Sequence, residues 1–159
     1  MNHITVTGLG SSNGDDSIGW VVASCVQEQL QDALPVRVLS CDRTGMEWLY
    51  RLRPDGALYL IDAVYSNGVP GTIVHYPDIS ELPMVSLPHR SSHGLGLPAL
   101  LSLAQTLGLL PRRVEFWGME IANHKPDSPL TKSVSQAVEV MASRLCVSIY
   151  RELAHLVKH

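Results

Sequence analysis

Short apolar segments recur along the chain at spacings that suit β-strands. Five of them are apolar or alternate apolar with polar residues, and turn-forming residues separate them: 3–9, 36–40, 57–63, 72–76 and 113–119. The segment 57–63, ALYLIDA, is apolar up to Asp62, which is typical of a strand that is covered on both faces. The sequence therefore predicts a sheet of about five strands.

Helical spacing occupies the segments between these strands. After residue 17, apolar residues recur every three or four positions, at Ile18, Val21, Val22, Cys25, Val26 and Leu30. Helices are also predicted over 44–53, over 95–109 and from Ser128-Pro129 onward, where a serine cap precedes a proline at the first helical position. Strands that alternate with helices predict a mostly parallel, twisted sheet with helices on both faces, which is a three-layer α/β/α domain.

Length and composition narrow the class of protein. The 159 residues suit a single domain spanning 1–159, and 45% hydrophobic with 17% charged residues excludes a disordered chain. Twelve Lys and Arg against 15 Asp and Glu give a net charge of −3, which argues against a nucleic-acid partner. The three cysteines (Cys25, Cys41 and Cys146) form no CxxC pair, which favours a reducing compartment. With no signal peptide and no long apolar run, we expect a cytoplasmic monomer without a membrane partner.

The loop after the first strand carries the first candidate chemistry. Gly8-Leu9-Gly10 lies between a strand and a helix, as in phosphate-binding loops, but the third glycine of such a motif is Asn13 here. Asp15 and Asp16 open the helix, where they would repel a phosphate and attract a cation. One aspartate would suffice to cap the helix, so the second indicates a further role.

A second carboxylate and a histidine are predicted to reach the same place. Asp62 ends an apolar strand, and the carboxyl ends of parallel strands meet at one rim, so Asp16 and Asp62 should lie close together. Two close carboxylates share a proton or hold a metal. His93, in a loop that enters a helix, would add a nitrogen ligand and suit a borderline divalent metal with open positions. The alternatives are an aspartate that caps the next turn and a surface histidine.

Taken in order, these motifs resemble the NiFe-hydrogenase maturation proteases. The matching segments are Gly8-Leu9-Gly10, Asp15-Asp16-Ser17-Ile18-Gly19, Cys41-Asp42-Arg43-Thr44, Leu60-Ile61-Asp62-Ala63, Ser91-Ser92-His93-Gly94 and Gly118-Met119-Glu120-Ile121. Two positions depart from the family pattern: Ser11 replaces the usual asparagine, and Arg43 replaces a glycine of a D-G-G-T turn. The form GSSNGDDSIGW resembles a branch that includes proteases for bidirectional, NAD-reducing-type hydrogenases.

The resemblance implies a specific reaction. Members of this family remove a C-terminal extension from the hydrogenase large-subunit precursor after nickel has entered that subunit. It also implies that Asp16, Asp62 and His93 are the catalytic and metal-contacting residues. The nickel would be carried by the substrate rather than held as a resident cofactor, and other divalent ions could occupy the site in crystals. Further residues expected to line the cleft are Asp15, Asp42 and Glu120.

The residues leave the mechanism and two rival functions open. The metal could polarise the scissile carbonyl or activate a water, or a carboxylate could act as general base while metal recognition controls access. The same ligands would suit a metal-dependent chaperone that cuts nothing. A nucleotide- or phosphate-binding α/β domain is the other alternative.

Overall fold

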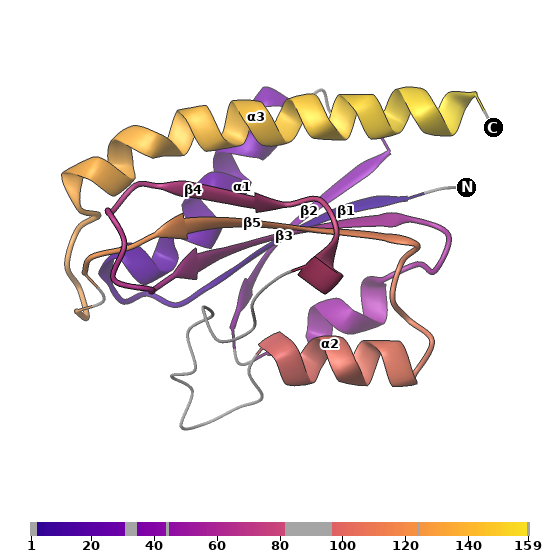
Figure 1. Cartoon of the computed structure of the whole chain (residues 1–159), viewed down its shortest axis with the longest axis horizontal. Helices are drawn as coiled ribbons and strands as arrows, with labels where there is room; N and C mark the ends of the chain where they lie inside the picture. Colours follow the sequence, from indigo (N-terminus) through magenta and orange to yellow (C-terminus); the bar gives the residue numbers. More distant parts are fainter. Residues whose placement is uncertain (1–2, 31–34, 44, 82–96, 124, 159) are drawn as a thin grey trace.

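The computed structural model describes residues 3–30, 35–43, 45–81, 97–123 and 125–158 (Figure 1). Five strands form one sheet in the order β2-β1-β3-β5-β4. Their bounds are β1 Ile4–Gly10, β2 Val36–Asp42, β3 Ala57–Val64, β4 Ile73–Tyr76 and β5 Arg113–Glu120. β1, β2, β3 and β5 run parallel, and β4 pairs antiparallel with β5 at the edge. The predicted α/β fold with a mostly parallel sheet of five strands is confirmed.

Helices cover both faces of the sheet, as Figure 1 shows. The α-helices are α1 Ile18–Gln29, α2 Leu97–Thr106 and α3 Lys132–Val157, and the 3₁₀-helices are η1 Gly14–Ser17, η2 Glu47–Arg51 and η3 Ile79–Glu81. α1 and α3 pack on one face, whereas η2 and α2 pack on the other. No helix within the described ranges is long and apolar enough to cross a membrane.

The central strand β3 explains the two apolar cores. All eight of its residues are buried, because helices lie on both of its faces. Tyr59, Ile61 and Ala63 contribute to the core under α1 and α3, whereas Leu58 and Leu60 contribute to the core under α2. Burying each large apolar side chain stabilises the fold by roughly 1.5–3 kcal/mol. The apolar run read from the sequence is therefore the middle of the sheet.

Two glycines set how closely α1 approaches the sheet. A Cβ atom on Gly19 would lie 2.0 Å from the Leu9 carbonyl oxygen and 2.8 Å from that of Ile61. A Cβ atom on Gly8 would lie 2.2 Å from the Gly19 carbonyl oxygen. Because neither position has room for a side chain, the helix rests directly on β1 and β3. This contact fixes the turn before α1 relative to the end of β3.

Two of the predicted helices differ in detail. The last helix begins at Lys132 with Thr131 as its N-cap, so the prediction of a start at Ser128-Pro129 is wrong. The Ser128 hydroxyl instead donates to the Lys125 carbonyl oxygen at 2.6 Å and accepts from the Asn123 amide at 3.0 Å, which stabilises a turn. The helix predicted over 44–53 is the short 3₁₀-helix η2.

Candidate functional site at the carboxyl ends of the strands

Three neighbouring strands bring acidic residues to one end of the sheet. β2 ends at Asp42, which pairs in register with Gly10 at the end of β1. Asp62 lies near the carboxyl end of β3, one residue beyond Ile61, whose pairing with Gly8 is the last between β1 and β3. Asp16 follows β1 in the 3₁₀-turn η1. Because these strands are parallel, the polar residues at their carboxyl ends lie along the same rim.

Asp16 and Asp62 contact the same cation, the guanidinium group of Arg43. Arg43 donates from Nη1 to Asp16 Oδ2 and from Nη2 to Asp16 Oδ1, both at 2.7 Å. Toward Asp62 it donates from Nη2 to Oδ1 at 2.5 Å and from Nε to both carboxylate oxygens at 3.2 Å. The two carboxylates predicted to converge therefore do so, and an arginine lies between them.

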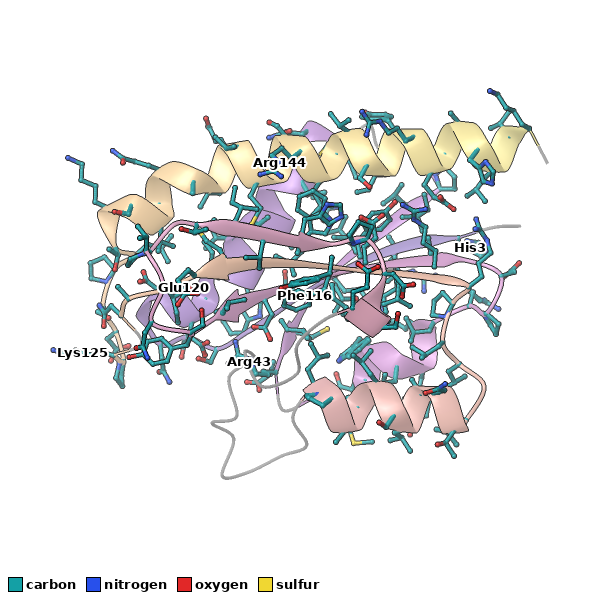
Figure 2. All side chains as sticks on the ribbon, viewed as in Figure 1. His3, Arg43, Phe116, Glu120, Lys125 and Arg144 are labelled. Atoms are coloured by element: carbon teal, nitrogen blue, oxygen red, sulfur yellow. The ribbon has the colours of Figure 1, made fainter. Side chains whose placement is uncertain are left out.

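The backbone places Arg43 for this contact. Its amide N–H donates to the Gly10 carbonyl oxygen at 2.9 Å, directly after β2 ends. From there the side chain, labelled in Figure 2, reaches past the end of β1 to Asp62 on the next strand. The Ser11 hydroxyl adds a further hydrogen bond to Asp16 Oδ2 at 2.5 Å.

Burial makes this ion cluster electrostatically strong. The side chains of Arg43, Asp16 and Asp62 are 12%, 13% and 1% exposed. Burial alone would lower the pKa of Arg43, but Asp62 and Asp16 outweigh it and raise that pKa above its ordinary value. Burial raises the pKa of Asp62, and the positive charge of Arg43 opposes this rise. Arg43 is therefore charged, and two carboxylates share one positive partner.

The carboxylate pair has the chemistry of a cation site. Four oxygens face one position, which suits a guanidinium or a divalent ion. Within the described residues, no three His, Cys, Asp or Glu side chains gather closely enough to hold a metal ion. His93, the third predicted ligand, lies outside the described residues. The carboxylates of Asp16 and Asp62 thus suit a cation, and the guanidinium group of Arg43 fills the space between them.

Asp15 is turned away from this cluster and is fully buried. It accepts hydrogen bonds from the backbone N–H groups of Ala122, Asn123 and Thr131 at 3.1, 2.9 and 2.6 Å, and from the Thr131 hydroxyl at 2.7 Å. Burial acts to raise the pKa of Asp15, but these hydrogen bonds outweigh it and hold the pKa below its ordinary value. Asp15 therefore ties the turn before α1 to the segment that leads into α3.

Glu120 and Asp42 differ from each other in their surroundings. Glu120, labelled in Figure 2, is 3% exposed and accepts hydrogen bonds from the backbone N–H groups of Ser66 and Gly68 and from the Ser66 hydroxyl, at 2.7, 3.0 and 2.7 Å. Its carboxylate therefore holds the turn after β3. Asp42 is exposed at the end of β2, and its carbonyl oxygen accepts a hydrogen bond from the Gly45 N–H at 2.9 Å.

Comparison with known proteins identifies the family. The family model described as hydrogenase maturation protease, HycI, matches residues 21–148, which is most of the chain. The chain belongs to the hydrogenase maturation protease family. The Hydrogenase 2 maturation protease of Escherichia coli strain K12 is 28% identical over 139 residues, covering 86% of this chain and 84% of that protein. The family assignment makes this protein a peptidase.

Solved structures agree with this assignment. The hydrogenase maturating endopeptidase HybD from E. coli superposes with a TM-score of 0.81 at 26% identity, covering 94% of this chain and 93% of that one. The NiFe hydrogenase maturation protease HycI from Thermococcus kodakarensis KOD1 has a TM-score of 0.71 at 18% identity, covering 91% and 90%. At 18% identity, the similarity to the T. kodakarensis structure shows that the two chains share a fold.

The partner role of Arg43 in this protease was not foreseen from the sequence. Sequence reasoning allowed a shared proton or a metal between Asp16 and Asp62, but not an internal cation. The available signal was Arg43 itself, a charged residue at a position where the family turn has glycine, one residue after a strand that ends at the same rim. Likewise, the hydroxyl of Ser11 stands where an asparagine is usual and bonds Asp16.

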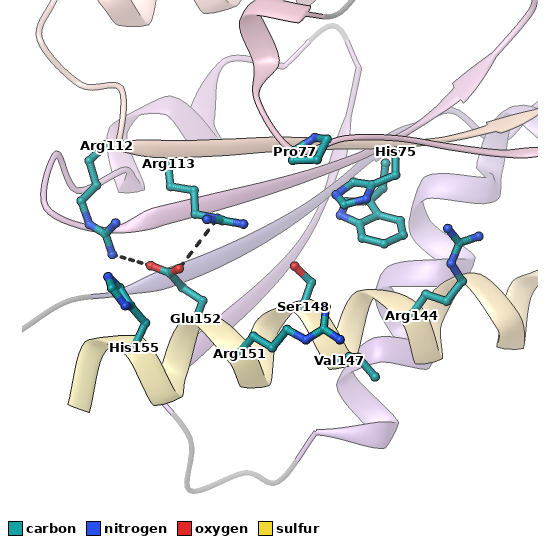
Figure 3. A pocket seen from close by; sticks show the side chains of 11 residues that line it. His75, Pro77, Arg112, Arg113, Arg144, Val147, Ser148, Arg151, Glu152 and His155 are labelled. Carbon is teal, nitrogen blue, oxygen red and sulfur yellow. Dashed lines mark hydrogen bonds and ion pairs between the residues drawn. The ribbon is translucent and has the colours of Figure 1, made fainter. Parts of the chain in front are cut away.

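A polar cavity of the protease lies away from the Asp16–Asp62 pair. Figure 3 shows it between α3 and the edge of the sheet, where it encloses about 710 Å³ and contains none of the predicted site residues. Arg112 and Arg113 pair there with Glu152, and Arg113 also contacts the fully buried Glu115 at 2.9 Å. Its buried acids are thus matched by arginines, in an arrangement that joins α3 to the start of β5.

Proposed function

We propose that this protease removes the C-terminal extension of a NiFe-hydrogenase large-subunit precursor after nickel insertion. Asp16 and Asp62, together with His93, recognise the nickel that the precursor carries. The observation that supports this most strongly is the convergence of Asp16 and Asp62 on one cation position at the carboxyl end of the sheet. The family to which the chain belongs supplies the peptidase activity.

An incomplete ligand set suits a metal that arrives with its substrate. Two carboxylates and one imidazole bind a free ion less strongly than a closed set of four ligands, but they can complete the coordination of an ion that a partner already holds. Nickel is thus substrate rather than resident cofactor. Binding through the nickel would bring the peptide bond to be cut to the carboxyl end of the sheet only when the precursor contains nickel.

The two carboxylates differ in access, and this suggests separate tasks. Asp62 is 1% exposed and rigidly held, because Oδ1 also accepts the Ala63 N–H at 2.7 Å. Asp16 is 13% exposed and lies in a short turn. We therefore assign Asp62 to orienting the bound cation, and Asp16 to accepting a proton from the attacking water when the peptide bond is hydrolysed.

The cysteines are consistent with a cytoplasmic protease. Cys25, Cys41 and Cys146 are all free thiols in the structure. Free thiols persist in reducing compartments, of which the cytoplasm is one.

The experiment is trimming of a nickel-loaded large-subunit precursor by the purified protease, followed by mass spectrometry of both products. We expect Asp16→Asn, Asp62→Asn and His93→Ala to lose the activity. Asp55→Asn is the matched control, because Asp55 is exposed in the turn before β3. Trimming at the wild-type rate by Asp16→Asn or Asp62→Asn would overturn the site. A stable complex that releases no peptide would indicate a chaperone instead of a protease.

A further inference from the structure

We propose that Arg43 is a resident cation that closes the Asp16–Asp62 pair to free divalent ions, so that the pair accepts a metal only from a partner able to displace the guanidinium. This inference rests on the proposed function in taking the pair as the place where nickel is recognised. Arg43 would then determine specificity, because it would allow the pair to bind a metal held by a partner protein but not a free ion.

The hydrogen bonds leave little of the pair available to an ion. All three guanidinium nitrogens donate, and all four carboxylate oxygens of Asp16 and Asp62 accept from them. The contact with Asp16 is a two-point fork, the strongest geometry that an arginine and a carboxylate form. Asp62 Oδ1 additionally accepts the Ala63 N–H at 2.7 Å. A metal ion would have to take oxygens that are already engaged.

Charge makes the two cations mutually exclusive. The guanidinium already lies within 2.5–2.7 Å of an oxygen of each carboxylate, so a divalent ion between the same oxygens would be in contact with it. Like charges at such a distance repel strongly, and the low exposure of the three side chains reduces screening by solvent. A free ion in water must therefore expel Arg43 without offering it another anionic partner.

A metal centre carried by a precursor can offer that partner. Arg43 is anchored by its backbone to Gly10, and its side chain is 12% exposed, so the exchange requires the guanidinium to move outward while the backbone stays in place. A metal held by anionic ligands such as thiolates brings a cation for the carboxylates and negative charge for the guanidinium at once. The chemistry that the exchange requires is thus a metal–thiolate centre rather than an aqueous ion.

The opposing interpretation is a purely structural ion pair. In that case Arg43 holds the rim together, and its removal weakens the fold without creating any affinity for metals. The two interpretations differ in what happens to Asp16 and Asp62 once the arginine is gone. A vacated cation site should bind an ion, whereas a broken structural contact should not.

The test is nickel binding by the untagged, full chain. We compare wild type, Arg43→Gln, the double variant Arg43→Gln with Asp62→Asn, and Arg37→Gln, whose exposed arginine lies on β2, the strand that Arg43 follows. Isothermal titration with Ni²⁺ gives the affinity, and thermal unfolding with and without Ni²⁺ gives the stabilisation. We expect Arg43→Gln to bind Ni²⁺ at least about tenfold more tightly than wild type and to gain about 3–6 °C in Tm at tenfold excess over its Kd.

The controls decide what the binding means. Wild type and Arg37→Gln should show neither effect, and the double variant should lose the gain. Wild type that binds Ni²⁺ as tightly as Arg43→Gln would overturn the proposal, and so would a folded Arg43→Gln that binds no ion. Binding retained in the double variant would also overturn it, because the ion would then be elsewhere.

A second measurement needs no variant, in case Arg43→Gln does not fold. The Arg43 Nε–H is hydrogen-bonded to Asp62, so it should give a slowly exchanging signal in a ¹⁵N-correlated NMR spectrum of wild type. We expect excess Zn²⁺ to leave this signal unchanged, and a saturable shift would contradict the proposal. None of these measurements uses a precursor, so failure of the peptidase assay and failure of this inference are distinguishable.

Discussion

Asp15 and Asp16 are adjacent in the sequence, yet their carboxylates contact different parts of the molecule. Asp15 accepts four hydrogen bonds from Ala122, Asn123 and Thr131, whereas Asp16 pairs with Arg43 at the rim. The short 3₁₀-turn before α1 produces this divergence, because successive side chains point in different directions there. Asp15 therefore stabilises the turn on which the site is built, whereas Asp16 is itself part of the site.

Asp15 should contribute to stability in a way that depends on pH. We expect Asp15→Asn to lower the free energy of unfolding by about 1–3 kcal/mol at neutral pH, because an amide presents one acceptor oxygen to four donors. The folded pKa lies below the ordinary value of 3.8, so this contribution is complete above pH 3.8 and is lost as the pH falls through the folded pKa. Urea unfolding of both proteins from neutral to acidic pH measures it. A difference that grows toward acidic pH would contradict the assignment.

Substitutions of Asp62 and Glu120 should distinguish a residue needed for trimming from one needed only for stability. Asp62→Asn removes the charge that faces Arg43, so we expect trimming to be lost along with about 1–3 kcal/mol of stability. Glu120→Gln weakens the hydrogen bonds to Ser66 and Gly68, so we expect about 1–2 kcal/mol of destabilisation with trimming retained. Urea unfolding and the trimming assay are run on both variants. Loss of trimming in a folded Glu120→Gln protein would place Glu120 in the reaction.

Gly19 should tolerate no side chain. Alanine would put Cβ 2.0 Å from the Leu9 carbonyl oxygen, so α1 would have to move away from β1 and β3. We expect a loss of about 3 kcal/mol or more in the free energy of unfolding. Gly108→Ala is the comparison, because a Cβ there meets nothing within 4 Å although its φ is +68°. Its cost should be the smaller one, of about 1 kcal/mol, and equal losses would contradict the packing argument.

Periodicity predicted the sheet because burial imposes it. The apolar run 57–63 predicted a strand covered on both faces, and β3 is buried throughout. The spacing from Ile18 to Leu30 likewise predicted α1. The start of α3 was missed because Ser128 and Thr131 both suit a cap, and the choice depends on the hydrogen bonds from Thr131 to Asp15, more than a hundred residues away in sequence.

The site was predicted in part, for a related reason. Parallel strands force their carboxyl ends together, so the approach of Asp16 and Asp62 follows from topology alone. The conformation of Arg43 does not, because a long side chain after a strand can point to solvent or inward. Its direction depends on the anchoring of its backbone at Gly10 and on the attraction of the two carboxylates for the guanidinium. The need for glycine at position 19 arises from contacts between α1 and the sheet, and the local sequence pattern does not indicate such contacts.

The most direct test of the central claim compares the same precursor with and without nickel. The fraction of precursor trimmed is measured by mass spectrometry over time, for wild type and for Asp62→Asn. We predict trimming of the nickel-loaded precursor by wild type, and none of the nickel-free precursor or by the variant. Equal trimming of both precursors by wild type would contradict recognition of substrate-bound nickel by Asp16 and Asp62.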